Sequence, residues 1–561
     1  MLIVAVIATL YALVLSFPVV LHPTTTLYGT HGDATGTVAI YWWWSYALSH
    51  GLPLLDNTMQ GVPLGSDWYL IPFVVFQVAI LAPLSYLAGP IAAYNIGALA
   101  SYPATAAVTF LLARRLGMGS WAAAFAGLAF AFFPLHTEKA QAHLDQAHME
   151  VFPAFLLFAL RWRQGGSKWN LAAAGAIAGL TLWTDIYMAF ILSVMAAGLF
   201  ALSVVIPDKR MGPSAGERIR RHVLALVIVG LVAALFVPAA VAVGARSGGG
   251  VTTAVASEAG SLRRSSNEIT VFSARPWEYV LPWYGNPLVP DSVRSFEKQH
   301  LHGSNFTEQS LFLSYTVILL ALVALVATRR GWRMPVVLGL AIVGIGVLFA
   351  APPTIHLGGL KVYMPSAVLG HYLSVFRVFS RFGMIVMLGA ALLAGVGLDD
   401  LRRRLSVRGG ALAALAVLPF VTLALEFTDV PPSRATALLP APAEYTWLQG
   451  QSAGILVEYP LAASPLATQE GQTTRYTLYQ MVHLHPMFNA APPASRASKY
   501  APQLEPYYSP YSVARLRSLG IRYVFVHRAD YAADGLQTPI SVEGLQYVTT
   551  LDGTDIFLVV R

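Results

Sequence analysis

The repeated long apolar runs constrain this chain more than any other feature of its sequence. Each is about 20 residues long, the length that an α-helix needs to cross about 30 Å of hydrocarbon. Charged residues make up only 11% of the 561 residues, against about 25% in soluble domains. We therefore expect a mainly α-helical, polytopic membrane bundle with about eleven transmembrane helices. The runs lie near residues 3–21, 93–113, 119–135, 149–165, 170–187, 188–206, 222–244, 308–328, 334–351, 378–398 and 410–426.

Basic residues gather in short clusters that follow every second run. Loops rich in Lys and Arg face the cytoplasm in membrane proteins. All the clusters agree on a cytoplasmic N-terminus and an extracytoplasmic C-terminus, and they account for the formal charge of +8 without any nucleic-acid partner. The clusters are Arg114-Arg115, Arg161 with Arg163 and Lys168, Lys209 to Arg221, Arg329 to Arg333, and Arg402 to Arg408.

One further apolar run, residues 70–90, breaks this alternation. Counted as a span, it would place Arg114-Arg115 outside and invert every later loop. We predict that it lies in the membrane interface or re-enters, within one large external loop over residues 22–92. A twelfth span is the alternative. The other external loops of this transmembrane module, residues 1–426, are then 136–148, 245–307 and 352–377.

The tail, residues 427–561, changes character. Residues 454–460, 521–527 and 555–560 are short apolar segments typical of buried strands. Residues 509–519 are helix-like, with Ser509 suited to the N-cap and Gly520 to the stop. The tail therefore predicts a small extracytoplasmic α/β domain. His483 and His485 could line an acceptor site there, but two histidines on a strand are more often structural.

Candidate catalytic chemistry begins at Asp33, which directly precedes a Trp-rich segment just after the first span. A carboxylate there can act as general base where a lipid-borne substrate meets water. The alternative is that Asp33 only N-caps the following helix. Asp56 and Asp67, in the same loop, are the alternative candidates for the catalytic carboxylate. The candidate pocket residues beside Asp33 are His31, Trp42 and Trp43.

Residues 136–150 hold titratable side chains at helical spacing. On one helix, two stripes would form: His136, Lys139, His143, Gln146 and Glu150, and beside it Gln141, Asp145 and His148. This leaves room for a divalent cation such as Mg²⁺ or Mn²⁺, with Asp33, His143 and Asp145 as candidate ligands. The spacing is not His-Glu-x-x-His, however, and polar external loops are usually solvated. We favour Glu138, Asp145 or Glu150 as a second acidic contributor beside Asp33, with Asp145 and Glu150 the catalytic candidates and His143 and His148 in the pocket.

Two arginines, Arg377 and Arg381, open the tenth run four residues apart on one helix face. Guanidinium groups suit phosphate, so these two can clamp the phosphate of a lipid carrier. The alternative is that they extend to bulk lipid headgroups. Arg263 and Arg264 are further phosphate-binding candidates. Other candidate pocket residues on the external side are Asp185, Glu268 and Trp277.

Several function classes are disfavoured. The chain has no cysteine, which excludes thiol catalysis, disulfides and cysteine metal sites. Ion-coupled transporters usually carry ionisable groups or broken helices near the bilayer centre. Here the acidic residues near the runs lie mostly at run ends, and polar residues concentrate on the predicted external side. A non-enzymatic transporter or flippase of lipid-linked precursors is kept as the alternative to an enzyme. A scaffold protein that acts through its external tail is the third hypothesis.

The chain resembles the GT-C superfamily of integral-membrane glycosyltransferases. The similarity lies in Gly32-Asp33 with the Trp run, Pro63-Leu64-Gly65-Ser66-Asp67, the Leu112 to Gly117 turn, and the Arg377/Arg381 segment. It implies an inverting transfer on the outer face of a bacterial plasma membrane, from a polyprenyl-phosphate sugar to a glycan, lipid or protein acceptor. Asp33 matches the catalytic aspartate of the family's first loop. The loop shows no clean paired-acid motif, which departs from the family pattern.

Overall fold

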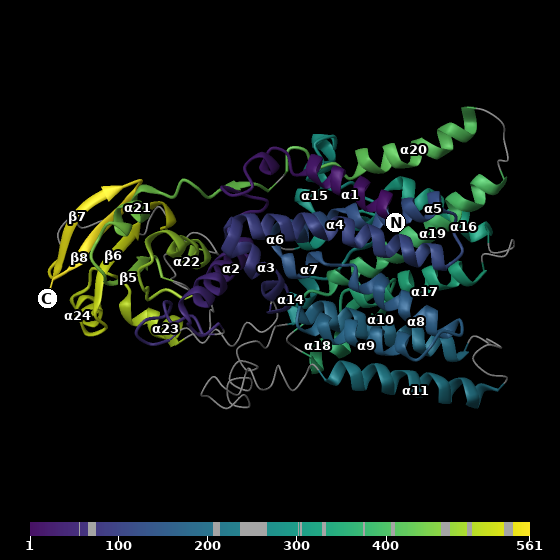
Figure 1. The fold of residues 1–561 in the computed structure, drawn as a ribbon, viewed down its shortest axis with the longest axis horizontal. Coiled ribbons are helices and arrows are strands. Elements are labelled where there is room, and N and C mark those ends of the chain that lie inside the picture. The colour runs from purple at the N-terminus through teal and green to yellow at the C-terminus, as the bar shows by residue number, and fades with distance from the viewer. Residues whose placement is uncertain are drawn as a thin grey trace. The chain divides into compact units, whose positions relative to one another are not determined.

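The computed structural model describes residues 1–54, 56–65, 75–205, 214–235, 266–300, 302, 306–327, 333–373, 376–404, 410–432, 434–461, 472–490, 496–531 and 542–560. These residues form two compact units. Unit 1 comprises Met1–Pro18, Ala98–Ala240 and Thr252–Ser433, and unit 2 comprises Val19–Gly97, Val241–Val251 and Arg434–Arg561. Unit 1 is mainly helical, and unit 2 combines helices with a small sheet (Figure 1).

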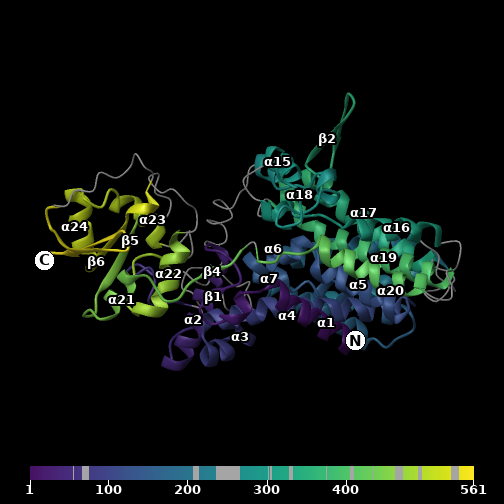
Figure 2. The ribbon, with the colours of Figure 1, turned by 90° about the horizontal axis from the view of Figure 1, so that it is seen from above.

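Each of the eleven predicted apolar runs contains a helix. The helices that lie wholly or mostly in unit 1 are α1 (Leu2–Leu15), α4 (Pro90–Arg115), α5 (Ser120–Phe132), α6 (Pro134–Ala142), α7 (Leu144–Ala147), α8 (Val151–Arg163), α9 (Trp169–Leu182), α10 (Ile186–Val205), α11 (Ala215–Ala234), α14 (Ser266–Val271), α15 (Asp291–Gln299), α16 (Tyr315–Ala327), α17 (Arg333–Ala350), α18 (Pro365–Tyr372), α19 (Gly383–Arg404) and α20 (Gly410–Glu426). A hairpin, β2 (Thr354–Leu357) with β3 (Leu360–Tyr363), extends from the same unit (Figure 2).

Helix α19 is the central element of unit 1. It is buried without interruption from Gly383 to Asp400 and packs against α5, α16 and α17. Its sequence is rich in Gly, Ala and other small residues, which let neighbouring membrane helices approach closely. An all-round apolar helix of this kind belongs in the interior of a bundle.

The number of membrane spans stays a prediction. Among the described residues, four helices are long and apolar enough to cross a membrane, or five if the bent pair α5 and α6 forms one span. Other helices in the predicted runs, such as α1, α9 and α16, are shorter apolar helices. The chain is thus a membrane-type helical protein, as expected.

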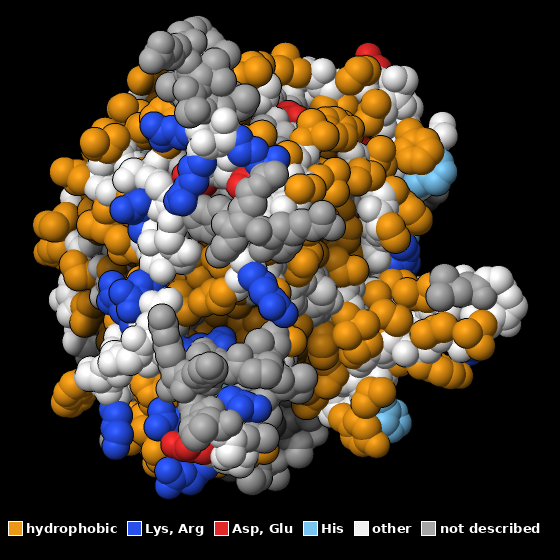
Figure 3. Space-filling model, turned by 90° about the vertical axis from the view of Figure 1, so that its right-hand side faces the viewer, with side chains coloured by type: hydrophobic (Ala, Val, Ile, Leu, Met, Phe, Trp, Pro, Cys, Tyr) orange, Lys and Arg blue, Asp and Glu red, His pale blue; other side chains and the backbone are white. Residues whose placement is uncertain are grey.

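The described residues of the basic clusters gather at one end of the unit 1 bundle. The backbone N–H of Gly119, which follows the Arg114-Arg115 turn, donates to Asp399 Oδ2 at 3.1 Å, and Asp399 also pairs with Arg403. Trp162 and His222 meet at 6.1 Å between ring centroids, so the last turn of α8 lies beside the first half of α11. Figure 3 shows many Lys and Arg side chains on this face. Which side of the membrane the face contacts stays a prediction.

Unit 2 joins the first loop to the tail. Strand β1 (Thr26–Leu27) pairs antiparallel with β4 (Thr436–Ala437), and α2 (Asp33–His50) packs against α22 (Gln472–His483). Helix α3 (Val75–Ala88) packs on α2. The residues just before it, 66–74, lie outside the described residues, and the placement of residues 70–90 in the interface stays a prediction. The predicted domain boundary at residue 427 stays a prediction.

The tail contains the predicted α/β fold. Its four-stranded sheet has the order β5-β6-β8-β7, with β5 parallel to β6 and the other pairs antiparallel. The predicted strands and the predicted helix are confirmed, and Ser509 caps that helix by accepting from Ser512 N at 3.0 Å. Sequence patterns did not indicate the edge strand β7. The elements are β5 (Ile455–Tyr459), β6 (Ile521–His527), β7 (Leu545–Leu551), β8 (Thr554–Val559), α21 (Ala443–Gln449), α23 (Arg496–Tyr500) and α24 (Pro510–Ser518).

Both faces of this sheet are covered. Val457, Val524 and Val526 belong to a core that includes Val513 and Leu516 of α24. On the other face, aromatic residues of α21 and α22 stack on one another and on the sheet. Strand β6 is buried at all but one position, which explains its near-continuous apolar sequence.

Candidate active site

Residues 136–150 do not form the single solvated helix that their spacing suggested. The chain breaks at His143, between α6 and α7, so the two predicted stripes are wrong. Nor is the segment solvated, because consecutive polar side chains from His136 to Lys139 are 0% exposed. Three of these four side chains have polar partners in unit 1: His136 contacts Ser101, Glu138 accepts from Trp283 and Tyr284, and Lys139 contacts Glu308. Such partners offset the cost of burying polar groups.

Three buried charges of unit 1 form a triad: Lys139, Glu308 and Arg381. Lys139 Nζ lies 2.6 Å from Glu308 Oε1. Arg381 donates to both oxygens of the same carboxylate, from Nε at 3.1 and 3.2 Å and from Nη2 at 2.6 Å. Burial by itself would raise the pKa of Glu308, but the positive charges of Arg381 and Lys139 hold that pKa well below its usual range. Glu308 is therefore a fixed anion between two fixed cations.

The second predicted arginine, Arg377, lies in a more open setting. Its Nη1 donates to Glu268 Oε2 at 3.1 Å, and both side chains are more than a third exposed. Its backbone N–H donates to the Tyr187 hydroxyl at 3.2 Å, and Arg381 lies 4.4 Å from the centre of the Tyr187 ring. The two arginines thus share one neighbour but differ in accessibility.

Other predicted residues join the same end of unit 1. Asp185 is buried and accepts from Gln146 Nε2 at 3.2 Å and from the backbone N–H of Met188 at 2.6 Å. Glu150 accepts from Thr105 Oγ1 at 3.3 Å and lies 2.8 Å from His148 Nδ1. Asp145 acts electrostatically on Lys139, and His143 acts on Glu308. The structure thus brings together the candidates from residues 136–150 with Asp185, Glu268, Arg377 and Arg381.

An aromatic pocket lies in the segment between α14 and α16. It contains about 410 Å³ of space, part of it open solvent. Trp283 Nε1 and the Tyr284 hydroxyl both donate to Glu138 Oε1, at 3.0 and 3.1 Å, which fixes one wall of the pocket to α6. The predicted pocket residue Trp277 lines it. The lining is Trp277, Glu278, Leu281, Trp283, Tyr284, Glu297, His300, Gln309, Ser310, Leu311 and Phe312.

Asp33 belongs to unit 2, where it is the first residue of α2. The N-cap is Gly32, and Thr35 Oγ1 accepts from its backbone N–H at 3.1 Å, so the interpretation of Asp33 as the N-cap is wrong. The side chain of Asp33 is exposed at the positive end of the helix dipole, where a carboxylate is stabilised. Because Arg377 and Arg381 belong to unit 1, a cavity shared with Asp33 stays a prediction.

The tryptophans that follow Asp33 are packed into unit 2. Trp43 is fully buried and its Nε1 donates to the Leu54 carbonyl at 3.2 Å. Trp42 is 7% exposed and stacks on Tyr46 at 5.3 Å between ring centroids. Both rings hold α2 in place, and a contact of either with substrate stays a prediction.

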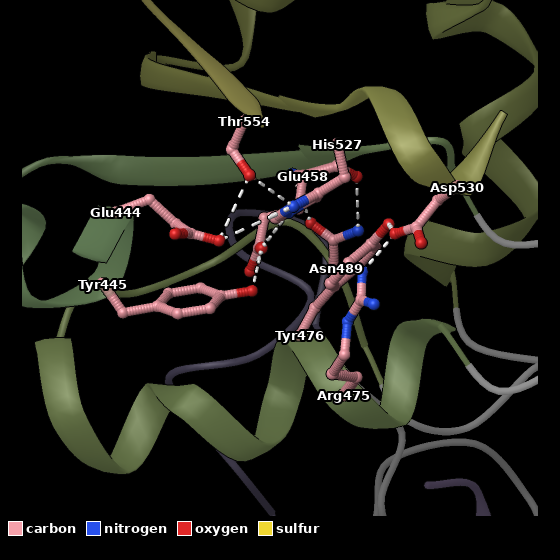
Figure 4. A network of polar contacts seen from close by, with 9 residues as sticks. All are labelled: Glu444, Tyr445, Glu458, Arg475, Tyr476, Asn489, His527, Asp530 and Thr554. Atoms are coloured by element: carbon pink, nitrogen blue, oxygen red, sulfur yellow. Dashed lines mark hydrogen bonds and ion pairs between the residues drawn. The ribbon is translucent and has the colours of Figure 1, made fainter. Parts of the chain in front are cut away.

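A polar network in the tail reaches the start of α2. His527 lies 2.7 Å from Glu458 Oε2 and 2.9 Å from Thr554 Oγ1 (Figure 4). Farther along, Arg475 is paired with Asp530, and both act on His31. Burial lowers the pKa of His31, Arg475 lowers it further, and Asp530 opposes this. Figure 4 shows the network, which includes Glu444, Tyr445, Glu458, Arg475, Tyr476, Asn489, His527, Asp530 and Thr554.

The two tail histidines considered for an acceptor site, His483 and His485, are not on a strand. His483 ends α22, and His485 lies in the following loop. His483 Nδ1 accepts from the backbone N–H of His485 at 3.0 Å. Burial lowers the pKa of His483 to about 3, with a smaller contribution from His485. These contacts favour the structural role over an acceptor site.

The roles of the remaining candidates stay predictions. Arg263, Arg264 and Asp67 lie outside the described residues. Asp56 is exposed in the first loop. No cluster of three His, Asp or Glu side chains suited to a metal ion is found in the parts of the chain that the structure describes. Asp33 also lies in a different unit from His143 and Asp145, and the metal site stays a prediction.

Two charged residues, one in each unit, were missed from the sequence. Glu308 precedes an apolar run as many solvated carboxylates do, and Arg475 lies in a stretch without apolar periodicity. The only available signal was that Glu308 is an acidic residue at a span end on the predicted external side. Its pairing with Lys139 joins positions 169 residues apart, which no local pattern reveals.

Comparisons with known proteins place this fold. No protein-family model and no curated protein sequence matches the chain. Among solved structures, it is similar to ArnT from Cupriavidus metallidurans bound to undecaprenyl phosphate, with 14% identity, a TM-score of 0.56, and 99% of this chain and 97% of ArnT covered. It is also similar to the archaeal oligosaccharyltransferase AglB from Archaeoglobus fulgidus, in complex with an inhibitory peptide and a dolichol-phosphate (14%, TM-score 0.54, covering 94% and 69%).

A third similar structure is the arabinofuranosyltransferase AftD from mycobacteria, with 16% identity and a TM-score of 0.55. The match covers 100% of this chain but 40% of AftD. These structures are GT-C glycosyltransferases, and the chain has the GT-C fold that its sequence resemblance implied.

Proposed function

We propose that this protein is a membrane glycosyltransferase that transfers a sugar from a polyprenyl-phosphate carrier to an extracytoplasmic glycan, lipid or protein. The observation that carries the proposal is the match to ArnT over nearly the full length of both chains. The convergence of the predicted site residues at one end of unit 1 supports it. Fold alone does not determine a reaction, so the reaction must follow from the residues of the site.

Arg377 is the cation that a lipid phosphate can reach. Arg381 is buried and already donates to both oxygens of Glu308. Arg377 is partly exposed, and its ionic partner among the described residues is the similarly exposed Glu268. An exposed pair of this kind is worth about 1 kcal/mol or less, so a phosphate can replace the carboxylate. Arg381 and Lys139 then act as positioning groups that hold the local structure.

The proposed chemistry is a single displacement. The carboxylate of Asp33 takes the proton of the acceptor hydroxyl, whose oxygen forms a bond to the anomeric carbon. The bond from that carbon to the carrier phosphate breaks, and the electron pair leaves with the phosphate oxygen. Arg377 stabilises the charge that develops there. Attack opposite the leaving group inverts the anomeric configuration.

Donor binding is tested with undecaprenyl phosphate and the purified full chain. Arg377→Gln should weaken binding about tenfold or more, since it removes a charge-assisted contact. Glu268→Gln should strengthen binding about two- to fivefold, because it removes the anion that competes with phosphate. Weaker binding by the Glu268→Gln protein would contradict the assignment of Arg377.

Sugar transfer is tested with labelled polyprenyl-phosphate sugars in reconstituted vesicles, by measuring new glycosidic bonds and released carrier phosphate. Asp33→Asn should abolish transfer while leaving undecaprenyl phosphate binding unchanged. Asp56→Asn changes the alternative carboxylate of the same loop and should leave transfer unchanged. Transfer at the wild-type rate by the Asp33→Asn protein sinks the base assignment, and movement of labelled lipid across the vesicle without any new bond favours a flippase.

A further inference from the structure

The aromatic pocket of unit 1 has the chemistry of a neutral, hydroxyl-rich ligand. Six of its lining residues have apolar or aromatic side chains, namely Trp277, Leu281, Trp283, Tyr284, Leu311 and Phe312. Small-molecule sites are typically apolar concavities with a few placed polar groups. Trp277 is 40% exposed, so one ring is open to a ligand, whereas Trp283 is 2% exposed and forms a fixed wall. Flat amphipathic rings of this kind pack against the C–H faces of sugars.

The two carboxylates of the pocket differ in whether their oxygen atoms already have hydrogen-bond partners. Glu278 is already engaged, because Oε1 lies 2.5 Å from His302 Nε2 and Oε2 accepts from the Arg275 backbone N–H at 2.7 Å. Glu297 Oε2 is buried and has no hydrogen-bond partner among the described residues. A buried polar atom without a partner is uncommon in native proteins. A ligand hydroxyl at this position would supply the missing hydrogen bond.

The charge of the pocket excludes the donor phosphate. Its lining holds two carboxylates, Glu278 and Glu297, and no Lys or Arg. Burial raises the pKa of Glu297 to about 7; the charge of Arg294 lowers this pKa, and the charge of Glu278 raises it further. The pocket therefore disfavours a further negative charge. A phosphate would meet carboxylates here, whereas at Arg377 it meets a guanidinium group.

We infer that this pocket is a subsite for a neutral saccharide unit of the acceptor, in which Trp277 stacks on the sugar and Glu297 hydrogen-bonds a hydroxyl. The assignment to the acceptor rests on the proposed function, but saccharide binding itself does not depend on transfer. The wall that Trp283 and Tyr284 form with Glu138 fixes the pocket to α6, the helix that carries Lys139.

The test is ligand-observed NMR of the purified full chain with neutral methyl glycosides of glucose, galactose, mannose and arabinofuranose. Trp277→Ala should weaken binding of the best of these about tenfold. Trp277→Phe should recover part of it, because it restores a ring. Trp169→Ala is the matched control, since Trp169 is 82% exposed on α9 and is not in the pocket lining. Thermal melting of each variant shows that it is folded.

Undecaprenyl phosphate provides the second arm of the experiment. Its binding should be unchanged by Trp277→Ala and should not compete with the methyl glycosides. The inference is overturned if none of the glycosides binds the wild-type protein, if Trp277→Ala and Trp169→Ala bind equally well, or if Trp277→Ala weakens undecaprenyl phosphate binding. If the glycosides bind as expected but no donor supports transfer, the proposed function fails while the saccharide site stands.

Discussion

At the scale of single residues, the carboxylate of Glu308 is the charge on which the site end of unit 1 depends. Glu308→Gln would leave Lys139 and Arg381 buried without their shared anion, and breaking such a buried pair costs about 3–5 kcal/mol. We expect a large fall in thermal stability in detergent. Glu268→Gln, at the exposed pair with Arg377, is the control and should change stability by about 1 kcal/mol or less. Equal shifts for the two variants would contradict the triad's role.

Through Glu297, the stability of the folded protein should depend on pH with the opposite sign to that expected for a carboxylate whose pKa is lowered on folding. The pKa of Glu297 is raised from 4.5 to about 7 by burial, so the folded protein holds a proton that the unfolded chain has released. Between these two values, stability falls as the pH rises. Melting temperatures measured from pH 4 to pH 8 should show this slope in the wild type, and Glu297→Gln should flatten it. An unchanged slope in the variant would place the titration elsewhere.

At the scale of helices, unit 1 depends on backbone contact between α19 and α16. A Cβ atom placed on Gly397 would lie 1.9 Å from the Leu320 carbonyl oxygen, so the two helices approach too closely for any side chain there. Gly397→Ala must push them apart, at a cost of about 1–3 kcal/mol. Gly344→Ala in α17 is the control, because a Cβ there meets nothing within 4 Å. Thermal melting should separate the two, and similar melting temperatures would be inconsistent with this packing.

Most helices and strands could be predicted from the sequence, and the exceptions have physical reasons. The apolar runs and the strands β5, β6 and β8 were found because each carries its own periodicity or apolar length. Strand β7 was missed because it is an edge strand with an exposed, mixed sequence. The break at His143 was missed because residues 136–150 keep helical spacing on both sides of it, and only long-range partners of α6 decide its burial.

At the scale of the whole molecule, the sequence predicted which segments carry the site but not their contacts. Charge alternation indicated that residues 136–150, Asp185 and Arg377 share one side, and the contacts in unit 1 are consistent with that. The pairing of β1 with β4 and of α2 with α22 joins distant parts of the chain, and no local pattern encodes it. For the same reason Arg475, close to His31, was not a candidate.

The orientation of the whole molecule in the membrane can be tested directly, because the chain has no cysteine and single cysteines can be introduced for labelling. Helix α19 begins beside Arg381 and ends at the basic cluster, and its 22 residues separate these by about 33 Å at 1.5 Å per residue. The basic end should therefore be cytoplasmic and the Arg381 end external. Gly359→Cys, at the exposed tip of the β2–β3 hairpin, should react with an impermeant maleimide on intact cells.

Ser167→Cys, in the exposed turn between the basic ends of α8 and α9, should react only after the membrane is permeabilised. The cysteine-free wild type gives the background, and both variants use small residues outside the site, so each reports accessibility rather than function. Labelling of Ser167→Cys on intact cells with protection of Gly359→Cys would invert the topology. It would also move Arg377 and the aromatic pocket to the cytoplasmic side, where an extracytoplasmic acceptor cannot reach them.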